Sequence, residues 1–182
     1  MGEDMRFFIL ALLSVFITAC STSYPNNDIV GQVFPTITGE SLASESISIP
    51  DAFKGSKTLL LIGYKQNSQF DIDRWLIGLD MTQTNVDVYE IPTIQGLLPR
   101  MFSTMIDNGM RKGIPKPLWK GVITVYSDGD EVQKLTGNTD PNNTRVILLD
   151  ENSTIIYFYD QGFSVDALNN LKDILDKNSE EI

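Results

Sequence analysis

The sequence contains no histidine and only one cysteine, Cys20. Histidine is the commonest general base and the commonest transition-metal ligand, so its absence excludes serine–histidine catalysis and the usual zinc and haem sites. Positive charge is also scarce, because 14 Lys and Arg stand against 24 Asp and Glu, for a formal net charge of −10. Such a surface repels nucleic acid, and we expect no nucleic-acid partner.

Cys20 lies at the end of a short apolar segment. The run Phe7–Ala19 follows the positive charge of Arg6, which is the layout of an export signal. The run is too short to cross the hydrocarbon core of a bilayer, which requires roughly 20 residues. We therefore predict a signal peptide over residues 1–19. The alternative is an ordinary cleaved signal next to a chance cysteine.

The last four residues of this segment, Ile17-Thr18-Ala19-Cys20, resemble the lipobox of bacterial lipoproteins. The resemblance implies that Cys20 becomes the mature N-terminus and carries a thioether-linked diacylglycerol, usually with an added N-acyl chain. Several acyl chains hold a protein on a membrane where a single chain does not. By analogy with enterobacterial sorting, Ser21 implies an anchor in the outer membrane, with the protein facing the periplasm.

The rest of the composition predicts one domain with two short flanks. Residues 20–29 are small and polar and are interrupted by Pro25, which is typical of a flexible tether. Residues 30–178 are long enough to form one hydrophobic core. Residues 179–182 form a short tail.

Strand and helix patterns alternate through this domain. After an irregular hairpin, the unbroken apolar run Thr58–Gly63 predicts a central strand covered on both faces. Ser68 is the predicted N-cap of the next helix, in a Ser-x-x-Asp motif. Further elements are expected at 85–91 (strand), near 99–109 (helix), at 121–126 (strand), at 131–135 (helix), at 145–159 (hairpin) and after Ser164 (helix). This order predicts an α/β fold, with a central mixed β-sheet, helices on both faces and a C-terminal hairpin plus helix.

Three segments resemble the thioredoxin-like superfamily, most closely its peroxiredoxin and membrane-anchored thiol-disulfide branches. Gly31–Ile37 is similar to their Gly-x-x-x-Pro-x-Phe opening, Ile47–Lys57 to the segment before their first core strand, and Arg145–Ile155 to their Phe-Ile-Ile-Asp-x-x-Gly-x-Ile hairpin. The resemblance spans residues 30–176 and implies a thioredoxin-like fold. A weaker similarity, carried by Arg111–Pro115 and the hairpin, is to the mitochondrial ATP-synthase assembly factors of this fold.

The loop after the predicted central strand lacks the cysteines that the resemblance implies. Redox members carry one or two cysteines at the start of the following helix, where the helix N-terminus lowers the pKa of the thiol. Here the loop reads Tyr64-Lys65-Gln66-Asn67-Ser68, and a serine hydroxyl without a histidine is a weak nucleophile. We interpret Ser68 as a helix cap, expect neither thiol peroxidase nor disulfide-exchange activity, and predict that the chain is not an enzyme.

The same resemblance implies a groove for extended peptide. Active relatives hold peptide between this loop and the turn before the hairpin strand, where Thr144 stands in the region of their cis-proline. The candidate groove residues are Tyr64, Lys65, Gln66, Asn67, Thr144 and Arg145.

A second candidate interface is a basic stretch in this acidic chain. It comprises Arg100, Arg111, Lys112, Lys116, Trp119 and Lys120. One interpretation is a solvated helix end and loop, because cations are favoured near a helix C-terminus. The other is a docking surface for an acidic partner or for anionic lipid headgroups, since Arg and Trp are enriched at binding hot spots. The methionines nearby, Met101, Met105 and Met110, are predicted to pack against the sheet.

The remaining patterns indicate no other chemistry. The carboxylate clusters Asp71/Asp73 and Asp128/Asp130/Glu131 follow no EF-hand pattern, so we interpret them as solvated acids of loops or helix starts. No Gly-rich phosphate loop or nicotinamide fingerprint occurs, so we expect no cofactor. The sequence thus predicts a lipid-anchored, redox-inactive thioredoxin-like domain that binds an envelope protein or peptide as an assembly or chaperone-like factor. The alternative is an envelope hydrolase or transferase without a catalytic thiol, or a cofactor-dependent oxidoreductase, on the same fold.

Overall fold

The computed structural model describes residues 22–177 of the chain. The predicted signal peptide 1–19, the predicted lipidation site Cys20 and the predicted tail 179–182 lie outside the described residues. Among the helices that are described, none is long and apolar enough to cross a membrane.

The strand β3 (Thr58–Gly63) is buried at every residue because it has partners on both edges and side chains packed on both faces. β4 (Asp87–Pro92) pairs with it in parallel, and β6 (Arg145–Leu149) pairs with it antiparallel. β7 (Ile155–Tyr159) extends the sheet, in the order β4-β3-β6-β7. This confirms the predicted central strand, the mixed sheet and the C-terminal hairpin.

A second, smaller sheet has the order β2-β1-β5. It consists of β1 (Ile37–Ser41), β2 (Ser46–Ile49) and β5 (Ile123–Thr124). Isolated bridges from Val122 to Glu90 and from Val125 to Thr93 connect it to the larger sheet. The strand predicted at 121–126 therefore shrinks to two residues, because its backbone pairs alternately with two sheets.

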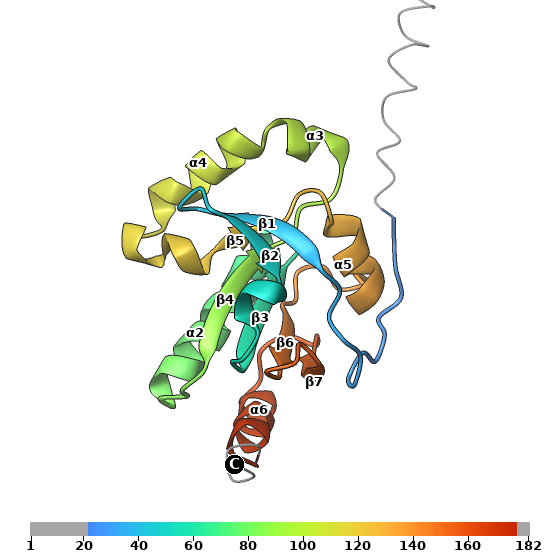
Figure 1. Ribbon diagram of the computed structural model, residues 1–182, viewed down its shortest axis with the longest axis vertical. Helices are drawn as coiled ribbons and strands as arrows, with labels where there is room; N and C mark the ends of the chain where they lie inside the picture. The colour runs from blue at the N-terminus through green and yellow to red at the C-terminus, as the bar shows by residue number, and fades with distance from the viewer. Residues whose placement is uncertain (1–21, 178–182) are drawn as a thin grey trace, which may run out of the picture.

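Helices cover both faces of the larger sheet, as predicted (Figure 1). Alternate β3 side chains point to opposite faces. Leu59 and Leu61 pack with α2 (Gln69–Met81) and α6 (Val165–Lys177), and Leu60 and Ile62 pack in a cluster that includes Val132 of α5 (Gly129–Thr136). Short 3-10 helices occur at Asp51–Phe53, Gln66–Ser68 and Lys116–Gly121.

The helices α3 (Leu97–Met101) and α4 (Ser103–Gly113) arch over the end of the molecule that is far from α6 (Figure 1). The prediction that the methionines pack against the sheet is wrong for Met101 and Met105, whose exposed fractions are 75% and 67%. The side of the helix that faces the domain carries Asp107 and Arg111 beside the partly buried Ile106 and Met110. Asp107 accepts a hydrogen bond from Tyr126 Oη (2.9 Å), and Arg111 Nε donates one to Leu42 O (2.8 Å).

The described part of the predicted tether, residues 22–29, lies against the domain. Tyr24 N donates to Asn138 Oδ1 (2.8 Å), Asn138 N donates to Tyr24 O (3.0 Å), and Asn138 Nδ2 donates to Thr22 O (2.8 Å). The close approach depends on Gly137, which has a φ of +78° and whose missing Cβ leaves room for the backbone of Pro25 and Asn26. The backbone and side-chain amides of Asn138 thus hold this segment against the domain, although its composition is typical of a flexible tether.

Candidate functional site

The loop between β3 and α2 presents three consecutive exposed polar side chains, Lys65, Gln66 and Asn67. The residues on either side, Tyr64 and Ser68, are buried. Within the loop, Ser68 N donates to Lys65 O (3.0 Å) and so does Ser68 Oγ (2.7 Å). A short, internally bonded turn therefore holds the exposed side chains at the N-terminal end of α2.

Ser68 stands at the N-cap position of α2, as predicted, but its side chain makes no capping hydrogen bond. The 3-10 turn at 66–68 runs directly into α2, which gives Ser68 the helical dihedrals φ −65° and ψ −18°. An N-cap residue needs non-helical dihedrals for its side chain to reach the following N–H groups. Ser68 is only 2% exposed, and its hydroxyl bonds back to the loop, so its oxygen is not presented to a substrate.

Tyr64 and Arg145 form the buried floor behind this loop. The Arg145 guanidinium carbon lies 5.0 Å from the centroid of the Tyr64 ring, within the range of a cation–π contact. Arg145 is fully buried, and Nη1 donates to the carbonyls of Asp140 (2.6 Å) and Asn143 (2.9 Å). In the described part of the chain, Nε and Nη2 find no acceptor. Burial lowers the pKa of the Arg145 guanidinium.

The Tyr64 hydroxyl is also withdrawn from solvent. It hydrogen bonds with Thr136 Oγ1 and donates to Val132 O at 3.5 Å, both in α5. Burial raises the pKa of Tyr64 to about 12, because the phenolate would lose its hydration. Tyr64 is therefore a neutral structural contact between the loop and α5 at physiological pH.

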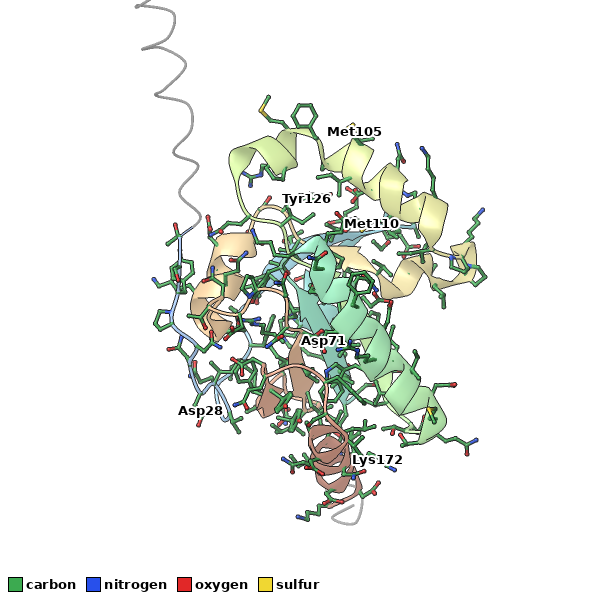
Figure 2. The ribbon with its side chains drawn as sticks, turned by 180° about the vertical axis from the view of Figure 1, so that it is seen from behind. Asp28, Asp71, Met105, Met110, Tyr126 and Lys172 are labelled. Atoms are coloured by element: carbon green, nitrogen blue, oxygen red, sulfur yellow. The ribbon has the colours of Figure 1, made fainter. Side chains whose placement is uncertain are left out.

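Thr144 is joined to α2 by a carboxylate that the sequence reading assigned to solvent. Thr144 N donates to Asp71 Oδ2 (2.9 Å), and Phe163 N donates to Asp71 Oδ1 (2.7 Å). Asp71 lies in the first turn of α2, as a helix-start acid, but it is only 6% exposed, so the expectation that it is solvated is wrong. One carboxylate thus connects α2, the turn before β6 and the loop before α6. Figure 2 labels Asp71 near the middle of the molecule. The Ser-x-x-Asp motif singled out Asp71 as part of a helix start, but it did not predict the bonds to Thr144 and Phe163.

The structure brings the six candidate groove residues together in two layers. Tyr64, Thr144 and Arg145 are buried, and Lys65, Gln66 and Asn67 are exposed beside them. Only the exposed layer can contact a partner without rearrangement, and the buried layer positions it. Binding of a peptide at this place remains a prediction.

The candidate basic interface separates into two groups. Arg111 contacts the Trp119 ring at 5.8 Å, and Lys120 forms a 2.9 Å ion pair with Glu45, so these three make contacts inside the domain. Arg100, Lys112 and Lys116 are exposed. The sequence reading missed the exposed apolar side chains next to them, Met101, Phe102 and Met105. The one signal in the sequence was the spacing of Asp107 and Arg111, which places two charged residues on one side of α4 and the exposed apolar residues on another.

No group of three or more carboxylate, cysteine or histidine side chains in residues 22–177 is placed to hold a metal ion. In the second carboxylate cluster, Asp128 Oδ2 accepts a hydrogen bond from Thr38 N (2.7 Å), and Asp130 accepts one from Gln95. Asp73, the exposed neighbour of Asp71, accepts one from Gln69 Nε2 (3.0 Å).

Solved structures with the same fold are numerous, although no protein-family model and no curated protein matches the sequence. The thioredoxin domain of a thiol-disulfide oxidoreductase from Bacteroides vulgatus is 19% identical, with a TM-score of 0.51, and the match covers 81% of this chain and 98% of that one. A thiol peroxidase from Chromobacterium violaceum is 12% identical, with a TM-score of 0.54 and coverage of 83% and 90%. An exposed lipoprotein thioredoxin from Streptococcus pneumoniae is 10% identical, with a TM-score of 0.52 and coverage of 76% and 98%.

These similarities correct one expectation and confirm another. The prediction that the chain is not an enzyme is contradicted, because the structures that share its fold include a thiol-disulfide oxidoreductase and a thiol peroxidase, which are enzymes. The missing loop cysteines therefore do not suffice to exclude an enzyme. The fold expectation is confirmed: the chain forms a thioredoxin-like α/β domain.

Proposed function

We propose that this protein is a lipoprotein, anchored through Cys20 in the outer membrane and facing the periplasm, whose thioredoxin-like domain binds an extended segment of an envelope protein. The binding surface is the loop at Lys65, Gln66 and Asn67. It acts without a thiol in the loop, as an assembly or chaperone-like factor would. The anchor is supported by the apolar run and small residues that precede Cys20.

The observation that carries this proposal is the rigid presentation of three exposed polar side chains. Lys65, Gln66 and Asn67 stand between two buried residues, and Ser68 closes the turn on the Lys65 carbonyl. Behind them, Arg145 bonds to two carbonyls of the 140–143 turn and stacks on Tyr64. A preorganised surface loses little conformational entropy when it binds, so more of the free energy of each polar contact contributes to the binding affinity.

A second support is that the adjoining surface already holds an irregular segment by its backbone. The backbone N–H and C=O of Tyr24 both bond to Asn138. The same loop continues to Thr144, and β6 begins at the next residue, Arg145. One of these bonds uses the Asn138 side chain and the other its backbone N–H, and both are made to the backbone of the segment, so they do not depend on its side chains.

Site-specific photo-crosslinking in intact membranes tests the binding surface. A photoreactive amino acid at position 66 is compared with one at position 173, an exposed site on α6. We expect discrete protein adducts from position 66 that position 173 does not give, and we expect Lys65→Glu to weaken them. Identical adducts from both positions, or adducts indifferent to Lys65→Glu, contradict the proposed surface.

The anchor has its own test. The mass of the N-terminal peptide of the membrane-bound protein should match an acylated Cys20, and Cys20→Ala should release the protein from the membrane fraction or leave it unprocessed. An N-terminal peptide of the mature protein with an unmodified Cys20 contradicts the lipoprotein assignment.

A further inference from the structure

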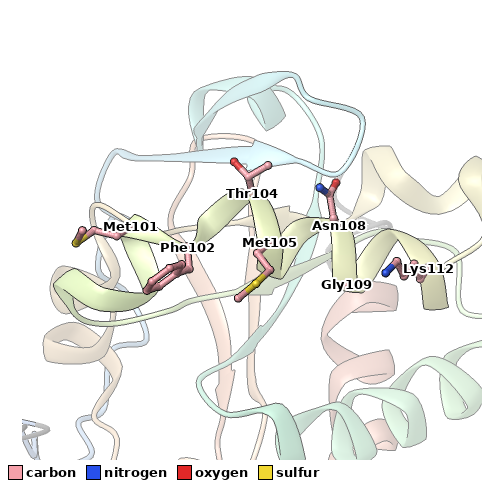
Figure 3. Close-up of a pocket in the computed structure, with 7 residues that line it drawn as sticks. All are labelled: Met101, Phe102, Thr104, Met105, Asn108, Gly109 and Lys112. Atoms are coloured by element: carbon pink, nitrogen blue, oxygen red, sulfur yellow. The ribbon is translucent and has the colours of Figure 1, made fainter.

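The two helices α3 and α4 carry a ridge of exposed apolar side chains. Met101, Phe102 and Met105 are 75%, 51% and 67% exposed, and we call these three residues the α4 ridge. They line one shallow hollow together with Thr104, Asn108, Gly109 and Lys112. Phe102 and Met105 point to the same side of the helix, and Thr104 and Asn108 point elsewhere (Figure 3). Contiguous exposed apolar side chains of this kind mark a contact surface.

The ridge faces outward because the opposite side of α4 is bonded to the domain. Tyr126 Oη donates to Asp107 Oδ1 (2.9 Å) and contacts Ser103 O (3.3 Å), and Arg111 donates to Leu42 O and Ser44 Oγ. Residues 107 and 111 are one turn apart, so they fix one stripe of the helix. The orientation of the ridge is therefore built into the fold.

The charge around the ridge is opposite to that of the whole protein. Residues 97–121 contain five Lys or Arg and a single carboxylate, Asp107, in a chain whose net charge is −10. Asp107 is 5% exposed and hydrogen bonded. Lys112 lines the same hollow as the ridge, Arg100 precedes Met101 in the chain, and Lys116 lies in the 3-10 helix that follows α4; all three are exposed and positive. The surface therefore combines apolar side chains with cations, which suits a sheet of anionic lipid headgroups.

The proposed anchor holds this surface near a membrane. Only Ser21 separates Cys20 from Thr22, whose carbonyl accepts a hydrogen bond from Asn138 of the domain. Two residues span at most about 7 Å, so a lipid on Cys20 leaves the domain little freedom to move away. Along the long axis of the molecule, the described chain starts in the same half as α3 and α4, and α6 lies at the opposite end (Figure 1).

We propose that the α4 ridge and its neighbouring cations rest on the anionic headgroup surface of the membrane that carries the protein's own anchor. This inference rests on the proposed lipidation of Cys20. Phe102 and Met105 enter the headgroup layer, and Arg100 and Lys112 pair with lipid phosphates. The lipid on Cys20 is the first contact with the membrane and the α4 ridge is the second. Two contacts fix the orientation of the domain, and therefore also the direction in which the 65–67 loop faces.

Headgroup quenching of a fluorescent label tests the docking. Once Cys20 is acylated, a cysteine introduced elsewhere is the only thiol, so Met105→Cys can be labelled selectively. Met81→Cys is the matched control, because Met81 is also exposed (79%) and ends α2 away from the ridge. The full chain is reconstituted in vesicles of phosphatidylglycerol and phosphatidylcholine with a headgroup spin label. We expect strong quenching at position 105 and weak quenching at position 81.

Charge variants complete the test. Each cation near an anionic surface is worth roughly fivefold in binding, so Arg100→Glu with Lys112→Glu should lower the docked-to-undocked ratio at least tenfold. Lys177→Glu, an exposed site on α6, should leave it unchanged. Pure phosphatidylcholine should act like the double variant. Equal quenching at positions 105 and 81, or equal quenching on neutral and anionic vesicles, overturns the proposal.

Flotation of the same vesicles separates this inference from the lipid anchor. Protein that floats with the vesicles but is not quenched at position 105 keeps its anchor, and the ridge is then assigned to a protein partner. Protein that neither floats nor carries acyl mass on Cys20 overturns the anchor and the docking together.

Discussion

The guanidinium of Arg145 lies 5.0 Å from the centre of the Tyr64 ring, and both side chains are withdrawn from solvent. The two residues come from different strands of the sheet, because Tyr64 follows β3 and Arg145 begins β6. Their contact joins the 64–68 loop to the turn at 140–144. The guanidinium of Arg145 and the neutral phenol of Tyr64 therefore hold the loop from behind, and a ligand would contact only the exposed side chains of the loop.

The burial of Tyr64 predicts a loss of stability at alkaline pH. Its pKa is raised to about 12 from an ordinary value of 10, so its stabilising contribution is complete below pH 10 and is lost as the pH rises toward 12. Between pH 9 and pH 11 this amounts to about 1.4 kcal/mol of unfolding free energy. Urea unfolding of Tyr64→Phe should show a correspondingly weaker pH dependence than the wild-type protein. Parallel pH profiles would contradict the assignment.

The carboxylate of Asp71 predicts a large cost for a small chemical change. Asp71→Asn replaces one of two acceptors by an amide donor, which then faces a backbone N–H of Thr144 or Phe163. We expect a loss of about 3 kcal/mol in unfolding free energy, because the buried N–H keeps no acceptor. Asp73→Asn is the control, since Asp73 is exposed and should cost under about 0.5 kcal/mol. Equal losses of stability in the two variants would show that the hydrogen bonds to the Asp71 carboxylate contribute nothing.

Two glycines in helices predict opposite effects of the same substitution. A Cβ on Gly78 of α2 would lie 2.9 Å from Leu168 Cδ2 of α6 and 3.0 Å from Phe163 Cε2, so Gly78→Ala should destabilise the fold by about 1–3 kcal/mol. A Cβ on Gly109 of α4 meets nothing within 4 Å, and Gly109→Ala should stabilise by about 0.5–1 kcal/mol. Thermal unfolding measures both. A Gly78→Ala variant as stable as Gly109→Ala would contradict the α2–α6 contact.

Most of the sheet could be predicted from the sequence, because its signal is local. The apolar runs of β3 and β6 report burial on both faces, and β7, at the edge of the sheet, is fully buried only at Ile155 and Tyr157. Ser164 is correctly predicted as an N-cap, and its Oγ accepts a hydrogen bond from Ala167 N (3.1 Å). Ser68 also stands at the N-cap position, but it makes no side-chain cap, because the preceding 3-10 turn already gives it helical dihedrals.

The orientation of α4 was not predicted, because Met101 and Met105 have the spacing of a buried face and the partners of Asp107 and Arg111 lie far away in the sequence. A helix with apolar residues on one side and Asp107 and Arg111 on the other turns its apolar side inward only if nothing pairs with the polar side. Here Tyr126 and the Leu42 carbonyl supply those partners from distant parts of the chain. Hydrogen bonds to buried polar groups outweigh the exposure of a few apolar side chains.

The sequence by itself determined the alternation of strands and helices, the absence of histidine chemistry, and the lack of cysteine in the 64–68 loop. These are properties of residue type and short-range spacing. Only the tertiary structure decided that Arg145 stacks on Tyr64, that Asp71 joins three elements, and that residues 22–29 lie on the loop after α5. Each of these contacts joins residues far apart in the chain, and only the folded sheet brings them within bonding distance.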